Sequence, residues 1–252
     1  MTNYLKNKLL WIQYTPGAAG RALLVCCTTS DAVGDWIDSP LPDPYKFTNE
    51  RFCVTNGTDH MANEPTTPYD TKWYTRNAFF TRGDDLTETE AYNSLLTCEL
   101  SKKHYNENKM IANVWHKPYI PKWAESIKVI TICSDNKTMP WLLQRRKEVL
   151  YKWSENTVHL LRYMPSHAPV GKHAKFYEPI KVEQPYTDAD AFVKEDIKKE
   201  MVTHGPGLNI NLSTLLYEDL ESTWDSIDAY LGKPIDRKWC NILMHTWRQR
   251  WV

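Results

Sequence analysis

The segment from Leu9 to Cys27 most constrains what this chain can fold into, because its composition changes from strand to helix within a few residues. The apolar run Leu9 to Tyr14 is followed by small and turn-forming residues at 15–20 (TPGAAG), and then by the run Arg21 to Cys27. Short apolar runs that end at Pro and Gly are typical of strands, whereas Ala and Leu favour helices. The segment therefore predicts a buried strand, a tight Pro-Gly turn and a helix.

Hydrophobic periodicity predicts that strands and helices alternate along the rest of the chain. The runs Met110 to Trp115 and Ile127 to Cys133 are apolar on both parities, which is typical of central strands in a covered, largely parallel sheet. Shorter strands are expected at Thr157 to Tyr163 and Leu208 to Leu212. Helices are expected from Thr87 to about Lys102, from Thr138 through Trp153, from Thr187 to a cap at Gly205, from Leu220 to a stop at Gly232, and from Asp236 to the C-terminus. This order predicts an α/β fold.

A single domain over residues 1–252 is expected from the chain length and from a hydrophobic content of 42%. The stretch Asp31 to Asp85 is rich in Pro, Asn, Thr, Asp and Gly and has little apolar period. It predicts a loop-rich insertion or cap with a short strand near Phe52 to Thr55. Pro165 to Tyr186 is expected to form a second loop region.

Charge and hydropathy argue against several function classes. The 31 basic and 31 acidic residues cancel, so nucleic acid is not an expected partner, and no apolar run approaches the roughly 20 residues of a membrane span. No H-E-x-x-H motif occurs, so no metal is expected. The six cysteines form no C-x-x-C pair, which favours free buried thiols in a reducing, cytoplasmic compartment. The 12% aromatic residues are compatible with a core or with stacking surfaces.

The turn after the first strand has the composition of an anion-binding loop. Small residues let backbone N–H groups approach an anion, and a helix that begins near Gly20 directs its positive end to the same place. Any sharp turn between a strand and a helix also favours Gly and Ala, so the loop alone leaves a phosphate site and a purely structural turn open. Only two residues separate Gly17 from Gly20, and Arg21 and Ala22 follow, so the pattern G-x-x-x-x-G-K-[ST] is absent.

Three segments, in order, resemble the sulfotransferases. The first is the strand and loop with Gly20-Arg21-Ala22-Leu23-Leu24, and the second is the strand Lys128 to Cys133 followed by Ser134-Asp135. The third is Tyr217-Glu218-Asp219-Leu220, with Leu231-Gly232 further on. The resemblance implies a P-loop-like three-layer fold, in which a mostly parallel sheet has helices on both faces.

The resemblance also implies that 3′-phosphoadenosine 5′-phosphosulfate donates a sulfuryl group to a hydroxyl or amine, and a carbohydrate or a small molecule is the expected acceptor. The residues expected to hold this donor are Pro16, Gly17, Ala18, Ala19, Gly20, Arg21, Ala22 and Ser134. The family has a lysine where Gly17 stands, an arginine where Ser134 stands and a serine near Leu142. Arg21 is the cation in the loop and thus a catalytic candidate. Arg145 and Arg146 on the following helix could restore some of the missing positive charge, but a solvated helix surface is the favoured interpretation.

Two histidines are candidates for the catalytic base. His116 ends a predicted central strand, where open α/β sheets place their ligands, and His60 lies in a polar segment of the insertion. Three functions stay open: a sulfotransferase, a catalytically inactive nucleotide-binding or interaction protein with the same fold, and another P-loop group transferase. The acceptor and the oligomeric state are not indicated by the sequence.

Overall fold

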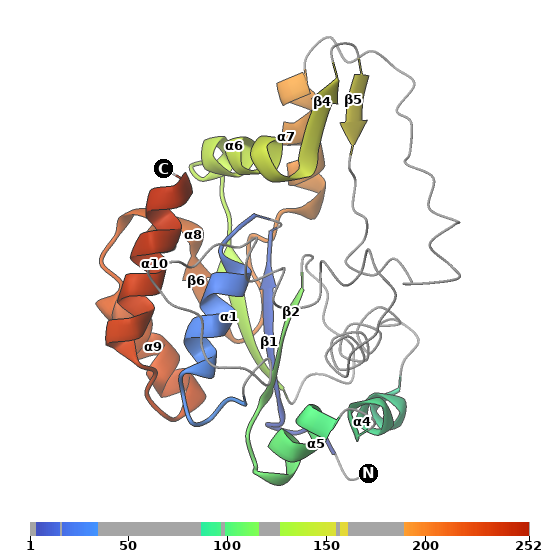
Figure 1. Ribbon diagram of the computed structural model, residues 1–252, viewed down its shortest axis with the longest axis vertical. Coiled ribbons are helices and arrows are strands. Elements are labelled where there is room, and N and C mark those ends of the chain that lie inside the picture. Colours follow the sequence, from blue (N-terminus) through green and yellow to red (C-terminus); the bar gives the residue numbers. More distant parts are fainter. Residues whose placement is uncertain are drawn as a thin grey trace.

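The structure, a computed structural model, describes residues 4–15, 17–34, 87–96, 99–115, 127–154, 157–160 and 189–251 (Figure 1). Nearly all of the predicted insertion at 31–85, including its expected strand at 52–55, lies outside these residues. The loop region predicted at 165–186 also lies outside them.

A parallel sheet forms the centre of the fold. Its strands are β1 (Leu9–Tyr14), β2 (Ile111–Trp115), β3 (Lys128–Cys133) and β6 (Leu208–Asn211). They are arranged in the order β2-β1-β3-β6, and every neighbouring pair is parallel. The prediction of an α/β fold with a largely parallel sheet is confirmed for the described part of the chain.

Helices connect and cover the strands. Their bounds are α1 Gly20–Thr28, α4 Glu88–Leu96, α5 Glu99–Asn106, α6 Met139–Leu150, α7 Ala189–Glu200, α8 Leu212–Tyr217, α9 Glu221–Leu231 and α10 Arg237–Trp251. A separate antiparallel hairpin joins β4 (Tyr151–Ser154) to β5 (Thr157–Leu160). Figure 1 shows α6 beyond the carboxyl end of the parallel sheet.

Three predictions of local structure need correction. The single helix expected at 87–102 is two helices, α4 and α5, and the helix expected after Thr138 to include Trp153 ends at Leu150, with Trp153 in β4. The strand expected from Thr157 is present as β5 and pairs in the hairpin. The helix expected to end at Gly205 ends at Glu200. The physical reason is that the backbone at Gly205 packs on the sheet: a Cβ there would lie 2.0 Å from Nε2 of Gln13 and 2.3 Å from Oγ1 of Thr131.

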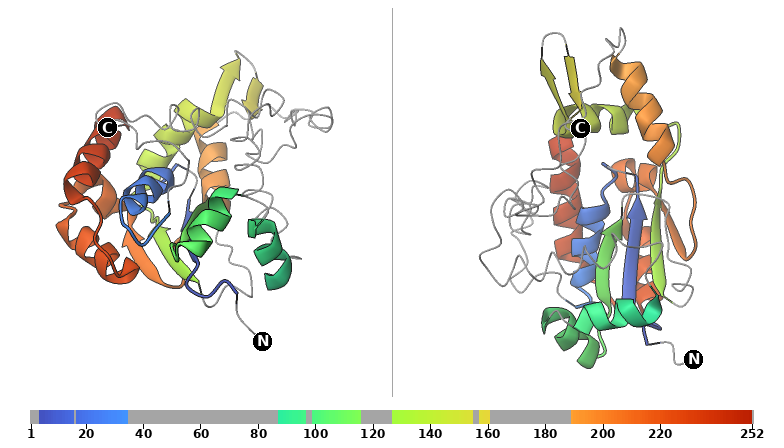
Figure 2. Two further views of the ribbon diagram at one scale, coloured as in Figure 1. Left: turned by 60° about the horizontal axis from the view of Figure 1, so that its bottom comes forward. Right: turned by 90° about the vertical axis from the view of Figure 1, so that its right-hand side faces the viewer.

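Both faces of β1 are buried, and its residues alternate between two hydrophobic clusters. Leu10, Ile12 and Tyr14 belong to a cluster that includes residues of α1, α9 and α10, whereas Leu9 and Trp11 pack with Ala91 of α4. Figure 2 shows α1 and α10 on the same side of the sheet. This alternation arises because successive side chains of a strand point to opposite faces of the sheet. Since both faces of β1 are buried, its odd and even positions are both apolar.

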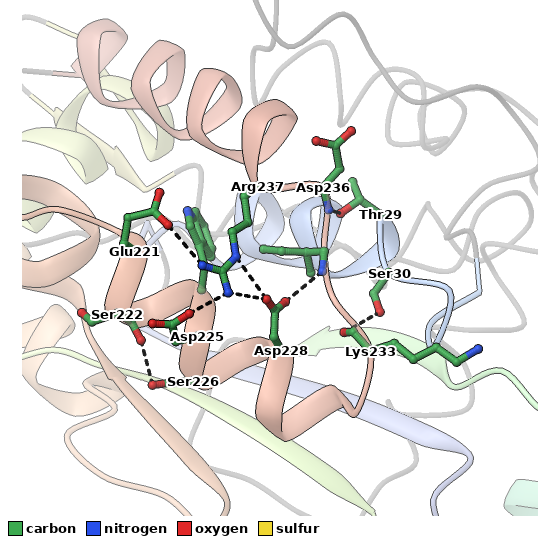
Figure 3. Close-up of polar contacts among 12 residues, drawn as sticks. Thr29, Ser30, Glu221, Ser222, Asp225, Ser226, Asp228, Lys233, Asp236 and Arg237 are labelled. Atoms are coloured by element: carbon green, nitrogen blue, oxygen red, sulfur yellow. Dashed lines mark hydrogen bonds and ion pairs between the residues drawn. The ribbon is translucent and has the colours of Figure 1, made fainter.

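Polar contacts anchor the C-terminal end of α1 to the junction of α9 and α10 (Figure 3). Oγ of Ser30 donates a hydrogen bond to the carbonyl of Lys233 at 3.0 Å, and Oγ1 of Thr29 accepts one from the amide of Asp236 at 2.9 Å. On the other side of this junction, the guanidinium of Arg237 pairs with the carboxylates of Asp228, Asp225 and Glu221. These contacts fix the end of α1 that is remote from the β1 loop.

The prediction of free thiols is confirmed for the described cysteines, of which Cys26, Cys27 and Cys240 are buried and Cys133 is partly buried. Cys53 and Cys98 lie outside the described residues. Burial raises the pKa of the Cys27 thiol well above its usual value, and the neighbouring Cys240 adds to this shift.

The buried thiols predict that stability falls at alkaline pH. A thiol whose pKa is raised by folding favours the unfolded state once the pH exceeds the unfolded pKa of about 8.5. We expect the free energy of unfolding to fall above this pH, and the fall to be shallower in Cys27→Ala by up to about 1.4 kcal/mol per pH unit. Urea denaturation from pH 7 to 10 measures both slopes, and equal slopes would contradict the assignment.

The end of α9 offers a test of its left-handed cap. Gly232 has a φ of 85°, and no atom lies within 4 Å of the position a Cβ would take. Gly232→Ala is therefore expected to lower the free energy of unfolding by about 1 kcal/mol through backbone strain alone. Gly232→Asn should lower the free energy of unfolding less than Gly232→Ala does, because Asn tolerates the left-handed conformation better than Ala. Urea denaturation measures both, and an alanine variant as stable as the original would disprove the strain.

Candidate functional site

The strand order places a reversal of direction beside β1. The chain continues from β1 to β2 on one side and later to β3 on the other, so neighbouring connections diverge at the carboxyl ends of β1 and β3. In open α/β sheets, ligands bind in the crevice that such a reversal leaves. Tyr14 and Ile132 are the last paired residues of the two strands. The loop after Tyr14 and the residue Ser134 therefore define the candidate site.

The loop after β1 has two residues in left-handed conformations. Gly17 has a φ of 99°, and Ala19, the residue before α1, has a φ of 46°. The amide of Ala18 donates to the carbonyl of Thr15 at 2.8 Å, and the amide of Ala19 donates to the carbonyl of Gly17 at 3.3 Å. These turns direct the chain from β1 into α1, as the sequence predicted.

The first amides of α1 have no acceptor within the described part of the chain. No side chain caps the helix, and the amides of Gly20, Arg21 and Ala22 make no hydrogen bond with the described residues. The first amides of a helix need acceptors, and the helix dipole adds a partial positive charge at this end. The start of α1 therefore has the donors and the polarity to bind an anion.

Gly20 is required by the close approach of Tyr14. A Cβ at residue 20 would lie 2.1 Å from Cδ1 of the Tyr14 ring, which is far inside van der Waals contact. Tyr14 is 3% exposed and belongs to the main hydrophobic cluster, so its ring has little room to retreat. The glycine thus lets α1 begin directly against the end of β1.

Ser134 brings a buried hydroxyl to the same face of the sheet as α1. It follows Ile132 by two residues, and alternation along the extended chain places both side chains on the face covered by α1. Ser134 is 2% exposed, and its Oγ has no hydrogen-bond partner among the described residues. Its amide donates to the carbonyl of Val202 at 2.7 Å, and the amide of Val202 donates to Oγ1 of Thr15 at 2.9 Å. Val202 therefore holds the two strand ends together.

Arg145 is buried beside the loop, so the expectation that it lies on a solvated helix surface is wrong. It is 5% exposed, and its Cγ and Cβ lie 3.3 and 3.9 Å from where a Cβ of Gly17 would be. Leu142, one turn earlier on α6, approaches the same point at 3.8 Å. The reason is that Leu142 is a core residue at i−3, which turns this side of α6 inward. That spacing is the signal in the sequence that identifies Arg145 as buried.

The other predicted residues are distributed differently. Arg21 is only half buried, and its neighbour Ala22 lies in the core. Pro16 and both candidate bases, His60 and His116, lie outside the described residues.

The other two segments that carry the sequence resemblance form turns in the described part of the chain. Oδ1 of Asp135 accepts the amides of Lys137 and Thr138 before α6. Tyr217 is exposed at the end of α8, and the segment that follows it leads into α9. These residues shape turns around the sheet.

Two negative findings apply to the described residues only. They contain no group of three or more His, Cys, Asp or Glu side chains that could bind a metal ion. None of their helices is both long enough and apolar enough to cross a membrane.

The contact between Gly20 and Tyr14 predicts the outcome of a small substitution. Gly20→Ala must displace the Tyr14 ring, and such overpacking is expected to lower the free energy of unfolding by about 1 to 3 kcal/mol. Urea denaturation checks this value. Tyr14→Leu should restore part of the loss in the double variant. A Gly20→Ala variant of unchanged stability would show that the ring does not restrict this position.

The site combines backbone donors that have no acceptor among the described residues, a buried hydroxyl and a buried arginine. Such a set is suited to binding an anionic group and stabilising negative charge that develops on it. Comparisons with models of protein families, with curated proteins and with solved structures found no match to this chain.

Proposed function

We propose that this site binds the phosphosulfate end of 3′-phosphoadenosine 5′-phosphosulfate and that the protein is a sulfotransferase. The acceptor would be a hydroxyl or amine of a small molecule or carbohydrate. The observation that carries the proposal is that the amides at the start of α1 and the buried hydroxyl of Ser134 lie on the same face of the sheet and have no acceptor or partner among the described residues. Together with the ordered sequence resemblance, it favours a phosphate-containing donor.

The described residues fit the anionic end of such a donor. The amides of Gly20, Arg21 and Ala22 supply backbone donors, and Ser134 supplies a hydroxyl that can donate one further hydrogen bond. The donor, when bound, supplies an activated sulfuryl group. These residues would orient its phosphate and stabilise the negative charge that builds there as the acceptor oxygen or nitrogen displaces it.

The proposal includes a P-loop-like three-layer arrangement. Support comes from β1 at the centre of a parallel sheet, from a strand, loop and helix at its carboxyl end, and from hydrophobic clusters on both faces. A base must also take the proton of the acceptor. His116 stays the first candidate, because it directly follows β2, the neighbour of β1, and His60 stays the second.

A non-catalytic nucleotide-binding protein is the second candidate, and one observation favours it. The position of the family's lysine is occupied by Gly17, whose φ of 99° and contact with Arg145 disfavour any side chain. A cation attached to the loop at this point is therefore sterically disfavoured. Transfer would need its cation from elsewhere in the fold.

Ligand binding tests the proposed function. Adenosine 3′,5′-bisphosphate, the product of transfer, is expected to bind with micromolar or better affinity and to raise the melting temperature. At 100 times the dissociation constant the stabilisation is about 2.7 kcal/mol. Adenosine 5′-monophosphate is the matched control and should bind more weakly, since it lacks one phosphate.

Two further measurements separate the candidates. Ser134→Ala is expected to weaken bisphosphate binding by about two- to tenfold, because it removes one buried donor. Incubation with the donor and pooled phenol, amine and sugar acceptors measures bisphosphate release. Binding without release would support the non-catalytic protein, and the absence of a thermal shift at millimolar bisphosphate would refute both.

A further inference from the structure

We infer that Arg145 of α6 is the anion-binding cation of this site and that it takes the place of a lysine in the loop. The inference rests on the proposed function for the identity of the nucleotide, but its geometric basis is independent of it. Among the residues whose side chains the structure describes, Arg21 and Arg145 are the candidates, and they differ in burial. That difference decides between them.

The stem of Arg145 occupies the space beside the loop. Its Cγ lies 3.3 Å from the position of a Cβ on Gly17, so a side chain at residue 17 and the stem of Arg145 compete for the same volume. The positive φ of Gly17 opposes a side chain for a second reason. Glycine at residue 17 and arginine at residue 145 are therefore complementary: one leaves the space that the other fills.

The surroundings of Arg145 on α6 are rich in donors. Trp141 lies one turn earlier on the same side of the helix, is 6% exposed, and its indole N–H has no partner among the described residues. An indole N–H can only donate. The amides at the start of α1 and the hydroxyl of Ser134 are two further sets of donors with no acceptor among the described residues. An anionic ligand supplies the acceptors.

Arg21 is less suited to this role. It is only half buried on α1, directly before Ala22, which is fully buried. A guanidinium that water reaches contributes little to binding an anion, whereas a buried guanidinium interacts in a medium of lower dielectric. An arginine fork also matches the paired oxygens of a phosphate or sulfate better than a lysine does. We therefore assign anion binding to Arg145 and a peripheral position to Arg21.

Four proteins and two ligands test this assignment. Wild type, Arg145→Gln, Arg145→Lys and Arg21→Gln, which removes only the side-chain cation and keeps the backbone amide of residue 21, are titrated with adenosine 3′,5′-bisphosphate and, separately, with inorganic pyrophosphate at constant ionic strength. Arg145→Gln is expected to lower the affinity for both ligands by at least about tenfold, which corresponds to the loss of one charged hydrogen bond. Arg145→Lys should weaken both by about threefold or more. Arg21→Gln should stay within about threefold of wild type.

The outcomes separate the inference from the proposed function. Equal binding by wild type and Arg145→Gln, or an equal loss in Arg21→Gln, would overturn the role of Arg145 even where the bisphosphate binds. In a third outcome, wild type binds pyrophosphate but not the bisphosphate, and Arg145→Gln loses pyrophosphate binding. This result would support the anion-binding role of Arg145 and refute the nucleotide as the ligand. Binding of neither ligand would refute both.

A second variant covers the case in which Arg145→Gln fails to fold. Trp141→Phe removes the indole N–H and keeps an aromatic side chain in the core. It is expected to weaken both ligands by about twofold or more, since one buried donor is lost. Circular dichroism and urea denaturation establish that each variant is folded before titration. Unchanged affinity in both Trp141→Phe and Arg145→Lys would overturn the assignment.

Discussion

The close approach of α1 to the end of β1 is the constraint on which the rest of the site depends. The ring of Tyr14 lies where a side chain of residue 20 would be, so the helix can begin against the strand only if that residue is glycine. This contact leaves no room for a wide loop, and the chain uses left-handed conformations at Gly17 and Ala19 to make the turn. The free amides of α1 consequently lie directly at the carboxyl edge of the sheet.

The sequence predicted the elements of this core because their physical signals are local. The strands β1, β2 and β3 are apolar on both parities, and the structure buries β1 on both faces. The capping box at the start of α4 is formed as expected: the amide of Thr87 donates to Glu90 at 2.8 Å, and the amide of Glu90 donates to Thr87 at 3.3 Å. Such patterns depend on neighbours within one turn or one strand, so a single sequence suffices to identify them.

Predictions that depend on distant contacts were less accurate. Gly205 is a residue type that often caps helices, but here it lets the backbone approach the side chains of Gln13 and Thr131. No local sequence pattern indicates this contact. Arg145 belongs to a charged stretch that is typical of an exposed helix face, and only its spacing from Leu142 indicates burial. In both cases tertiary packing overrides the local preference. The function itself depends on such contacts, so sequence patterns alone leave it open.

The missing loop lysine and the buried Arg145 have one geometric explanation. An anion at the start of α1 can receive positive charge from the loop or from an element that packs across it, and α6 packs across it here. Once the stem of an arginine fills the space beside residue 17, a loop side chain at that position becomes sterically unfavourable. The reverse holds as well, because a side chain at residue 17 would push α6 away. The two arrangements disfavour each other, so absence of the lysine motif need not mean absence of an anion site.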